Sequence, residues 1–197
     1  MKKNNYPEYA EVNGRRYKIN TDFRYAIECD RIARDDTIGD YERALAIICT
    51  LFGEEGLNVP EDYNKLSEVA KTYLLCGKEK KEEDNKEPDM DYEQDMDLIE
   101  ASFMSDYRID LSNKKMHWWK IYKLMNGLSN SEFGNCCILN RVRNLRNLNL
   151  NDIKDPKTKE EIRKQKEQWS LKRKEKEHDF TENEIENMNE FENLIGL

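Results

Sequence analysis

Apolar side chains recur every three or four residues along most of the chain, which is the spacing of one face of an α-helix. Segment 40–52 is followed by Gly53, and segment 60–77 begins at Pro60 and ends at Gly77. Proline favours the first turn of a helix and glycine its termination, so both segments are predicted helices. Two more predicted helices begin after Thr21 and Ser112, which are the expected N-caps. Three others are predicted over 92–107, 131–140 and about 155–176.

The N-terminus has a different pattern. Residues 9–12 and 15–19 are short β-capable runs joined by Asn13 and Gly14, and Asn-Gly suits the type I′ turn of a β-hairpin. A lone hairpin is marginal in water, so it must pack on the helices or join a sheet from another copy. The sequence therefore predicts a mainly α fold: a hairpin over 9–19, a bundle of about six helices, a charged loop in the middle, and a polar C-terminal helix and tail.

Composition limits the size of the core. Only 37% of the 197 residues are hydrophobic, 38% are charged, and the mean hydropathy is -1.02. Residues 78–88 contain no large apolar side chain and form a predicted charged linker. We expect one domain over 1–176 and a flexible acidic tail over 177–197. No stretch approaches the roughly 18 apolar residues of a membrane span, and 1–20 lack the apolar core of a secretion signal, which predicts a cytoplasmic protein.

Charge is unevenly distributed around a net value of -8. Residues 141–176 hold 13 basic and 6 acidic residues, whereas 177–197 hold 7 acidic residues and no Lys or Arg. The basic segment could bind nucleic acid, but Trp169 is its only aromatic residue available for base stacking. A solvated helix face balanced by the chain's own acids, or an acidic protein partner, is the favoured interpretation.

No residue pattern indicates catalysis, a metal or a cofactor. The two histidines are His117, in an apolar aromatic segment where a satisfied core or interface histidine is expected, and His178 in the charged tail. Paired C-x-x-C motifs, H-E-x-x-H and phosphate-binding glycine loops do not occur in the sequence. We therefore predict a protein that is not an enzyme, and reduced thiols at positions 29, 49, 76, 136 and 137.

Two features suggest a protein partner. Trp118 and Trp119 are adjacent on a predicted helix, where successive side chains point about 100° apart. Either both lie in the core or one contacts a partner, where Trp is a frequent hot spot. The last long helix has only Ile162 and Trp169 as its apolar stripe, which is thin for packing. The candidate partner-binding residues are Trp118, Trp119, Ile162 and Trp169.

Several ordered motifs resemble one family of phage proteins. They are Ile19–Arg24 after the hairpin, Leu75–Lys78, Ile109–Leu111 leading to His117–Lys120, Asn126–Leu128, Leu150–Lys154 and the basic helix after Asp155. Together, over about residues 8–176, they resemble the family known as "gene product fifteen", found in long-tailed phages and prophages of low-GC Gram-positive bacteria.

The resemblance implies a role in building the phage tail. Genes of this family lie in the tail module just before the tape-measure gene, where tail assembly chaperones are encoded. The implied protein is a non-enzymatic tail assembly chaperone in the host bacterial cytoplasm, which self-associates and binds the tape-measure protein. The alternatives are a structural minor tail or tail-completion protein of the virion, and a nucleic-acid-binding regulator that uses residues 141–176.

Overall fold

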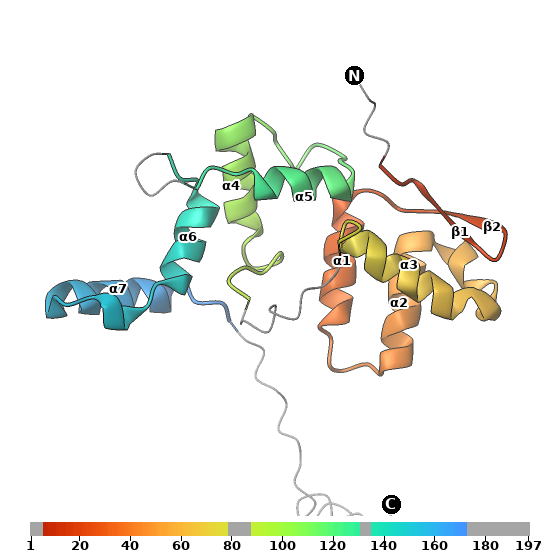
Figure 1. Cartoon of the computed structure of the whole chain (residues 1–197), viewed down its shortest axis with the longest axis horizontal. Helices are drawn as coiled ribbons and strands as arrows, with labels where there is room; N and C mark the ends of the chain where they lie inside the picture. Colours follow the sequence, from red (N-terminus) through yellow and green to blue (C-terminus); the bar gives the residue numbers. More distant parts are fainter. Residues whose placement is uncertain (1–5, 79–87, 131–134, 173–197) are drawn as a thin grey trace, which may run out of the picture.

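A computed structural model describes residues 6–78, 88–130 and 135–172, which form a mainly helical protein with a short N-terminal hairpin (Figure 1). The predicted fold class is confirmed. The elements in chain order are β1 (Tyr9–Val12), β2 (Arg15–Lys18), α1 (Phe23–Ala33), α2 (Asp40–Phe52), η1 (Glu54–Leu57), η2 (Pro60–Asp62), α3 (Tyr63–Leu74), α4 (Met96–Tyr107), α5 (Trp118–Asn126), α6 (Ile138–Asn147), η4 (Leu150–Asp152) and α7 (Pro156–Gln168).

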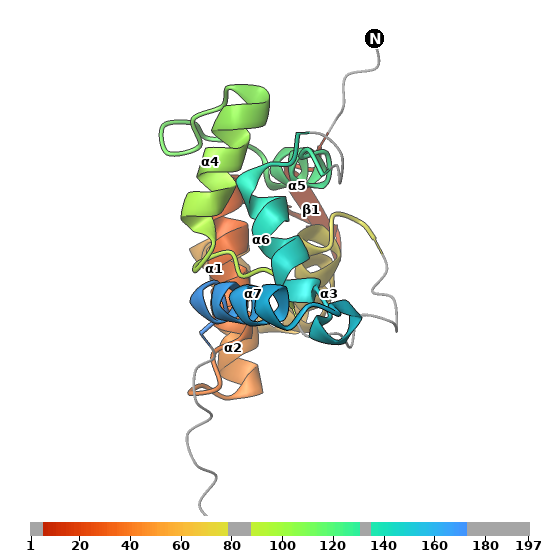
Figure 2. The same ribbon diagram turned by 90° about the vertical axis from the view of Figure 1, so that its left-hand side faces the viewer.

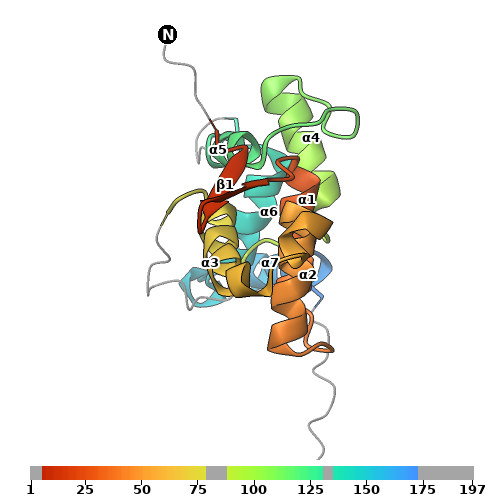
Figure 3. The same ribbon diagram turned by 90° about the vertical axis from the view of Figure 1, so that its right-hand side faces the viewer.

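The hairpin forms as its turn residues predict. β1 and β2 pair antiparallel, from Tyr9 opposite Lys18 to Val12 opposite Arg15. Asn13 and Gly14 take φ values of 50° and 77°, the left-handed region that a type I′ turn requires at both positions. Val12 and Tyr17 are buried, so one face of the hairpin joins the core. Figure 3 shows the hairpin crossing above α3, beside α1 and α5.

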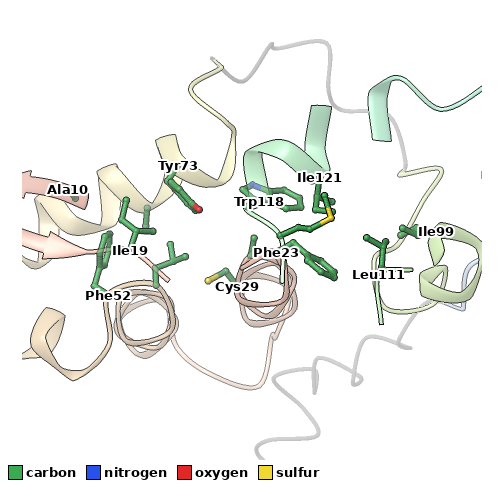
Figure 4. Packing of buried hydrophobic residues seen from close by; sticks show 14 of the residues in the cluster. Ala10, Ile19, Phe23, Cys29, Phe52, Tyr73, Ile99, Leu111, Trp118 and Ile121 are labelled. Atoms are coloured by element: carbon green, nitrogen blue, oxygen red, sulfur yellow. The ribbon is translucent and has the colours of Figure 1, made fainter. Parts of the chain in front are cut away.

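One core connects the two halves of the chain. In the N-terminal half, 6–78, α1 and α2 lie side by side and α3 packs against α2 (Figure 1). In the C-terminal half, 88–172, α5 contacts α1, and α6 contacts both α4 and α7. Figure 4 follows the buried side chains from Ala10 and Phe52 at one end, past Phe23 and Trp118, to Ile99 of α4 at the other.

Two predicted helix starts are wrong. Asp22, not Thr21, caps α1, because its carboxylate accepts the backbone N–H of Arg24. The helix predicted from Ser112 begins only at Trp118, with His117 as its cap. Met116 and His117 are held in extended pairing with the residues before α1, since Phe23 N donates to Met116 O and Trp118 N donates to Thr21 O.

Three further helix boundaries differ from prediction. α4 begins at Met96 rather than near 92, because the Asp91 carboxylate accepts the N–H groups of residues 93 and 94 and forms a separate turn. The helix predicted over 131–140 is α6, which begins at Ile138 and continues through the arginines to Asn147. α7 ends at Gln168, well before 176.

Several predicted segments lie wholly or largely outside the described residues. They are most of the charged linker (79–87), the predicted start of the 131–140 helix (131–134), the predicted end of the basic helix (173–176) and the acidic tail (177–197).

Candidate interaction sites

Trp118 and Trp119 join α5 to the end of α3. Nε1 of Trp119 donates to the carbonyl of Tyr73 at 2.9 Å, and Nε1 of Trp118 donates to the next carbonyl, Leu74 O, at 3.0 Å. The last carbonyls of a helix lack partners within the helix, and the Trp118 indole supplies one for Leu74 O. Tyr73 O also accepts the backbone N–H of Cys76, so the Trp119 indole gives it a second hydrogen bond. Two side chains that diverge on α5 thereby reach two consecutive carbonyls of α3.

The two indoles differ in burial. Trp118 is 4% exposed and belongs to the core, where Tyr92 and Tyr122 contact it edge-on. Trp119 is half-buried and packs against the core from outside. Both residues therefore contribute to the fold of a single chain, and only Trp119 also presents part of its ring at the surface.

His117 is fully engaged beside the tryptophans. Its Nδ1 accepts the backbone N–H of Trp119 at 3.1 Å and caps α5, while Nε2 lies 3.0 Å from the carbonyl of Pro7. This pairing fits the neutral tautomer with the proton on Nε2. The ring also stacks on Tyr6. The prediction of a satisfied histidine is confirmed.

A shallow hollow opens beside Trp119. It has a volume of about 420 Å³ and lies between the end of α3 and the outer face of α5. Lys78 Nζ sits 4.6 Å from the centroid of the Tyr122 ring, and Lys123 Nζ sits 4.8 Å from that of Tyr6. The six lining residues are Cys76, Lys78, Trp119, Tyr122, Lys123 and Asn126.

Arg146, near the end of α6, holds the C-terminal arm, which we define as residues 148–172. Its two terminal nitrogens pair with the buried carboxylate of Asp95 at 2.7 and 2.8 Å. Its Nε donates to the carbonyl of Trp169 at 2.7 Å, at the end of α7. Beyond α7, Gln94 exchanges two hydrogen bonds with the backbone of Lys172, at 2.8 and 3.0 Å. These contacts explain why the helix stops at Gln168.

The C-terminal arm and the end of α6 carry apolar residues that remain incompletely buried. α7 has no buried residue, and its main contacts are with α6 and η4 at one edge of the molecule (Figures 1 and 2). None of the arm's apolar side chains belongs to the core or to the half-buried shell around it. The apolar residues concerned are Leu145, Leu148, Leu150, Ile153, Ile162, Trp169 and Leu171.

Some arginines of the basic segment form ion pairs within the chain. Arg143 pairs with Asp89 and Arg146 with Asp95, both in the acidic stretch that precedes α4. Arg163 pairs with Glu160 on α7 itself. Sequence analysis identified the basic segment but did not pair it with the acidic residues before α4, although their opposite charge was the available signal.

Burial affects the ionisation of two cysteine thiols. Burial raises the pKa of Cys29 to about 12 and that of Cys76 to about 11, which keeps both thiols protonated at neutral pH. Within residues 6–78, 88–130 and 135–172, no group of three or more His, Cys, Asp or Glu side chains is arranged to hold a metal ion.

No helix in the described ranges combines the length and apolar character needed to cross a membrane.

Comparison with known proteins identifies a family. No curated protein and no solved structure matches the chain. A family model described as "Bacteriophage Gp15 protein" matches residues 3–171, nearly the whole described chain. The chain therefore belongs to the bacteriophage Gp15 protein family.

Proposed function

We propose that this phage protein is a non-enzymatic tail assembly chaperone that binds the tape-measure protein through its C-terminal arm. The observation that carries the proposal is the incompletely buried apolar side of the arm. A helix with one apolar residue in thirteen gains little from its own packing. A partner helix laid along the arm would remove Leu148, Ile162 and Trp169 from water, and burial of such side chains is the main driving force of association.

The role requires no catalytic group. A chaperone for a long client must cover apolar surface temporarily and then release it. An arm held to the body by Arg146 and Gln94, with its apolar residues half-exposed, suits such binding.

Co-purification tests the proposal. The tagged full-length protein is captured from cells in which the phage is assembling, and the tape-measure protein is quantified by mass spectrometry. Wild type is expected to retain the tape-measure protein, and Ile162→Glu to lose it. Because Ile162 is partly buried, the melting of this variant is compared with that of wild type, and loss of the tape-measure protein counts only for a folded variant.

The matched control is Gln165→Glu. It adds the same negative charge to an exposed position of α7 and should retain the client. Equal capture by Ile162→Glu and wild type would overturn the role of the arm, and no tape-measure protein with any variant would overturn the proposed function.

A further inference from the structure

The hollow beside Trp119 is a cationic site in an acidic protein. Lys78 and Lys123 flank it, and no carboxylate among the described residues pairs with either ammonium group. Instead each lies over an aromatic ring, Tyr122 or Tyr6, and Lys78 Nζ also lies 3.4 Å from the Tyr122 hydroxyl. Burial raises the pKa of Cys76, which also lines the hollow, and the charges of Lys78 and Lys123 act against that rise.

The wall of the hollow is fixed and aromatic. The hydrogen bond from Trp119 to Tyr73 O holds the indole in one orientation. Gly77 lies against the same ring, because a Cβ built there would be 3.4 Å from the Cη2 atom of Trp119. A ligand for such a site offers carboxylates to the two lysines and an apolar side chain to the rings.

The sequence contains a segment with this chemistry. Residues 177–197 carry seven acidic residues, no Lys or Arg, and several large apolar side chains, among them Phe180 and Phe191. In all three views the described chain ends in the lower part of the molecule, whereas α5 runs along its upper side (Figures 1, 2 and 3). A neighbouring molecule can present this segment to α5 directly, whereas the same molecule would have to lead it around its own body.

We propose that the hollow formed by Cys76, Lys78, Trp119, Tyr122, Lys123 and Asn126 binds the acidic segment 177–197 of a second copy of this chain. The contact is head-to-tail, because the hollow and the segment are different surfaces. Such a contact therefore joins copies into closed rings or open filaments and does not form a two-fold symmetric dimer. The inference does not depend on the identity of any client.

The test measures self-association of the full-length protein by sedimentation velocity over a range of concentrations. Wild type is expected to associate, with weakening at high salt because the contact is ionic. A synthetic peptide of residues 177–197 should compete with assembly and shift the tryptophan emission. The double variant Lys78→Glu/Lys123→Glu should associate about tenfold more weakly.

Two controls separate a site from a general charge effect. Lys114→Glu/Lys115→Glu changes the net charge equally at exposed lysines of the loop before α5, and should associate as wild type does. Reversing Glu184 and Glu186 to Lys should restore association when that variant is mixed with Lys78→Glu/Lys123→Glu.

Three outcomes would overturn the proposal. They are a protein that stays monomeric at every concentration, association that the Lys78 and Lys123 changes leave intact, and peptide binding at Trp119 in a chain that never associates. The last result would assign the hollow to the segment of the same molecule.

Discussion

The hydroxyl of Tyr17 donates a 2.6 Å hydrogen bond to the carboxylate of Asp62, which is completely buried. The same carboxylate accepts bonds from Asn13 at 2.6 Å and Arg15 at 3.1 Å. Asp62 ends η2 immediately before α3, so one carboxylate joins the turn and second strand of the hairpin to the start of a core helix. The hydrogen bond from Tyr17, followed by that from Asn13, holds the pKa of Asp62 below its usual range.

Acid should weaken the fold through Asp62. A carboxyl group with a lowered pKa in the folded state stabilises the protein above its unfolded pKa of about 3.9, and this contribution is lost as the pH falls through the folded value. Asp62→Asn should therefore lower the free energy of unfolding at neutral pH and flatten its dependence between about pH 5 and about pH 2. Urea denaturation at a series of pH values measures both effects.

The exposed Asp152 provides the control for this experiment, since Asp152→Asn should leave the pH profile unchanged. An Asp62→Asn profile that is as steep as that of wild type would show that the carboxylate does not carry the acid dependence.

Two buried tyrosines should respond oppositely to loss of the hydroxyl. The Tyr73 hydroxyl is buried without a hydrogen-bond partner in the described structure, and that burial raises its pKa. An unsatisfied buried polar group costs about 1–3 kcal/mol, so Tyr73→Phe should leave stability unchanged or increase it. Tyr17→Phe removes the bond to Asp62 and should lower stability by about 1–2 kcal/mol. Matched urea denaturation curves decide the point, and a loss in Tyr73→Phe as large as that in Tyr17→Phe contradicts it.

Removal of the Arg146 side chain should be among the most damaging single changes. Arg146→Met leaves the carboxylate of Asp95 buried without its partner, which typically costs about 3–5 kcal/mol. It also frees the carbonyl of Trp169 and should make the C-terminal arm more sensitive to limited proteolysis. Arg163→Met, which breaks an exposed pair with Glu160, should change stability by less than about 1 kcal/mol. Similar losses in the two variants would contradict the assignment.

Substitution of the two tryptophans should lower the stability of the protein to different extents. Trp118→Ala opens a cavity in the core and should cost about 3–5 kcal/mol. Trp119→Ala should cost clearly less, because Trp119 is only partly buried at the edge of the core. Thermal unfolding followed by circular dichroism gives the comparison. A greater loss of stability in Trp119→Ala than in Trp118→Ala would contradict the assignment of Trp118 to the core and Trp119 to its edge.

Local signals in the sequence predicted most of the helices. α2 and the end of α3 are specified by periodic apolar residues and by the glycines that follow them, and the hairpin turn by Asn13 and Gly14. The start of α5 could not be read in this way. It depends on Met116, whose N–H and carbonyl bond to Asp22 and Phe23, residues far away in sequence.

The candidate site was predictable only in part. Adjacent tryptophans and a thin apolar stripe indicated contact surfaces, and the structure assigns different environments to Trp118 and Trp119. The Arg146–Asp95 pair joins residues 51 apart, which no spacing rule connects. The hollow beside Trp119 depends on how the end of α3 meets α5, so Lys78 and Lys123 gave no signal in the sequence.

The most direct test of the proposed function is quantitative mass spectrometry of the protein in lysate of phage-producing cells and in purified particles. A tail assembly chaperone is abundant in the lysate, bound to the tape-measure protein, and absent from finished particles. A fixed copy number in purified particles would contradict the account and identify a structural protein of the tail.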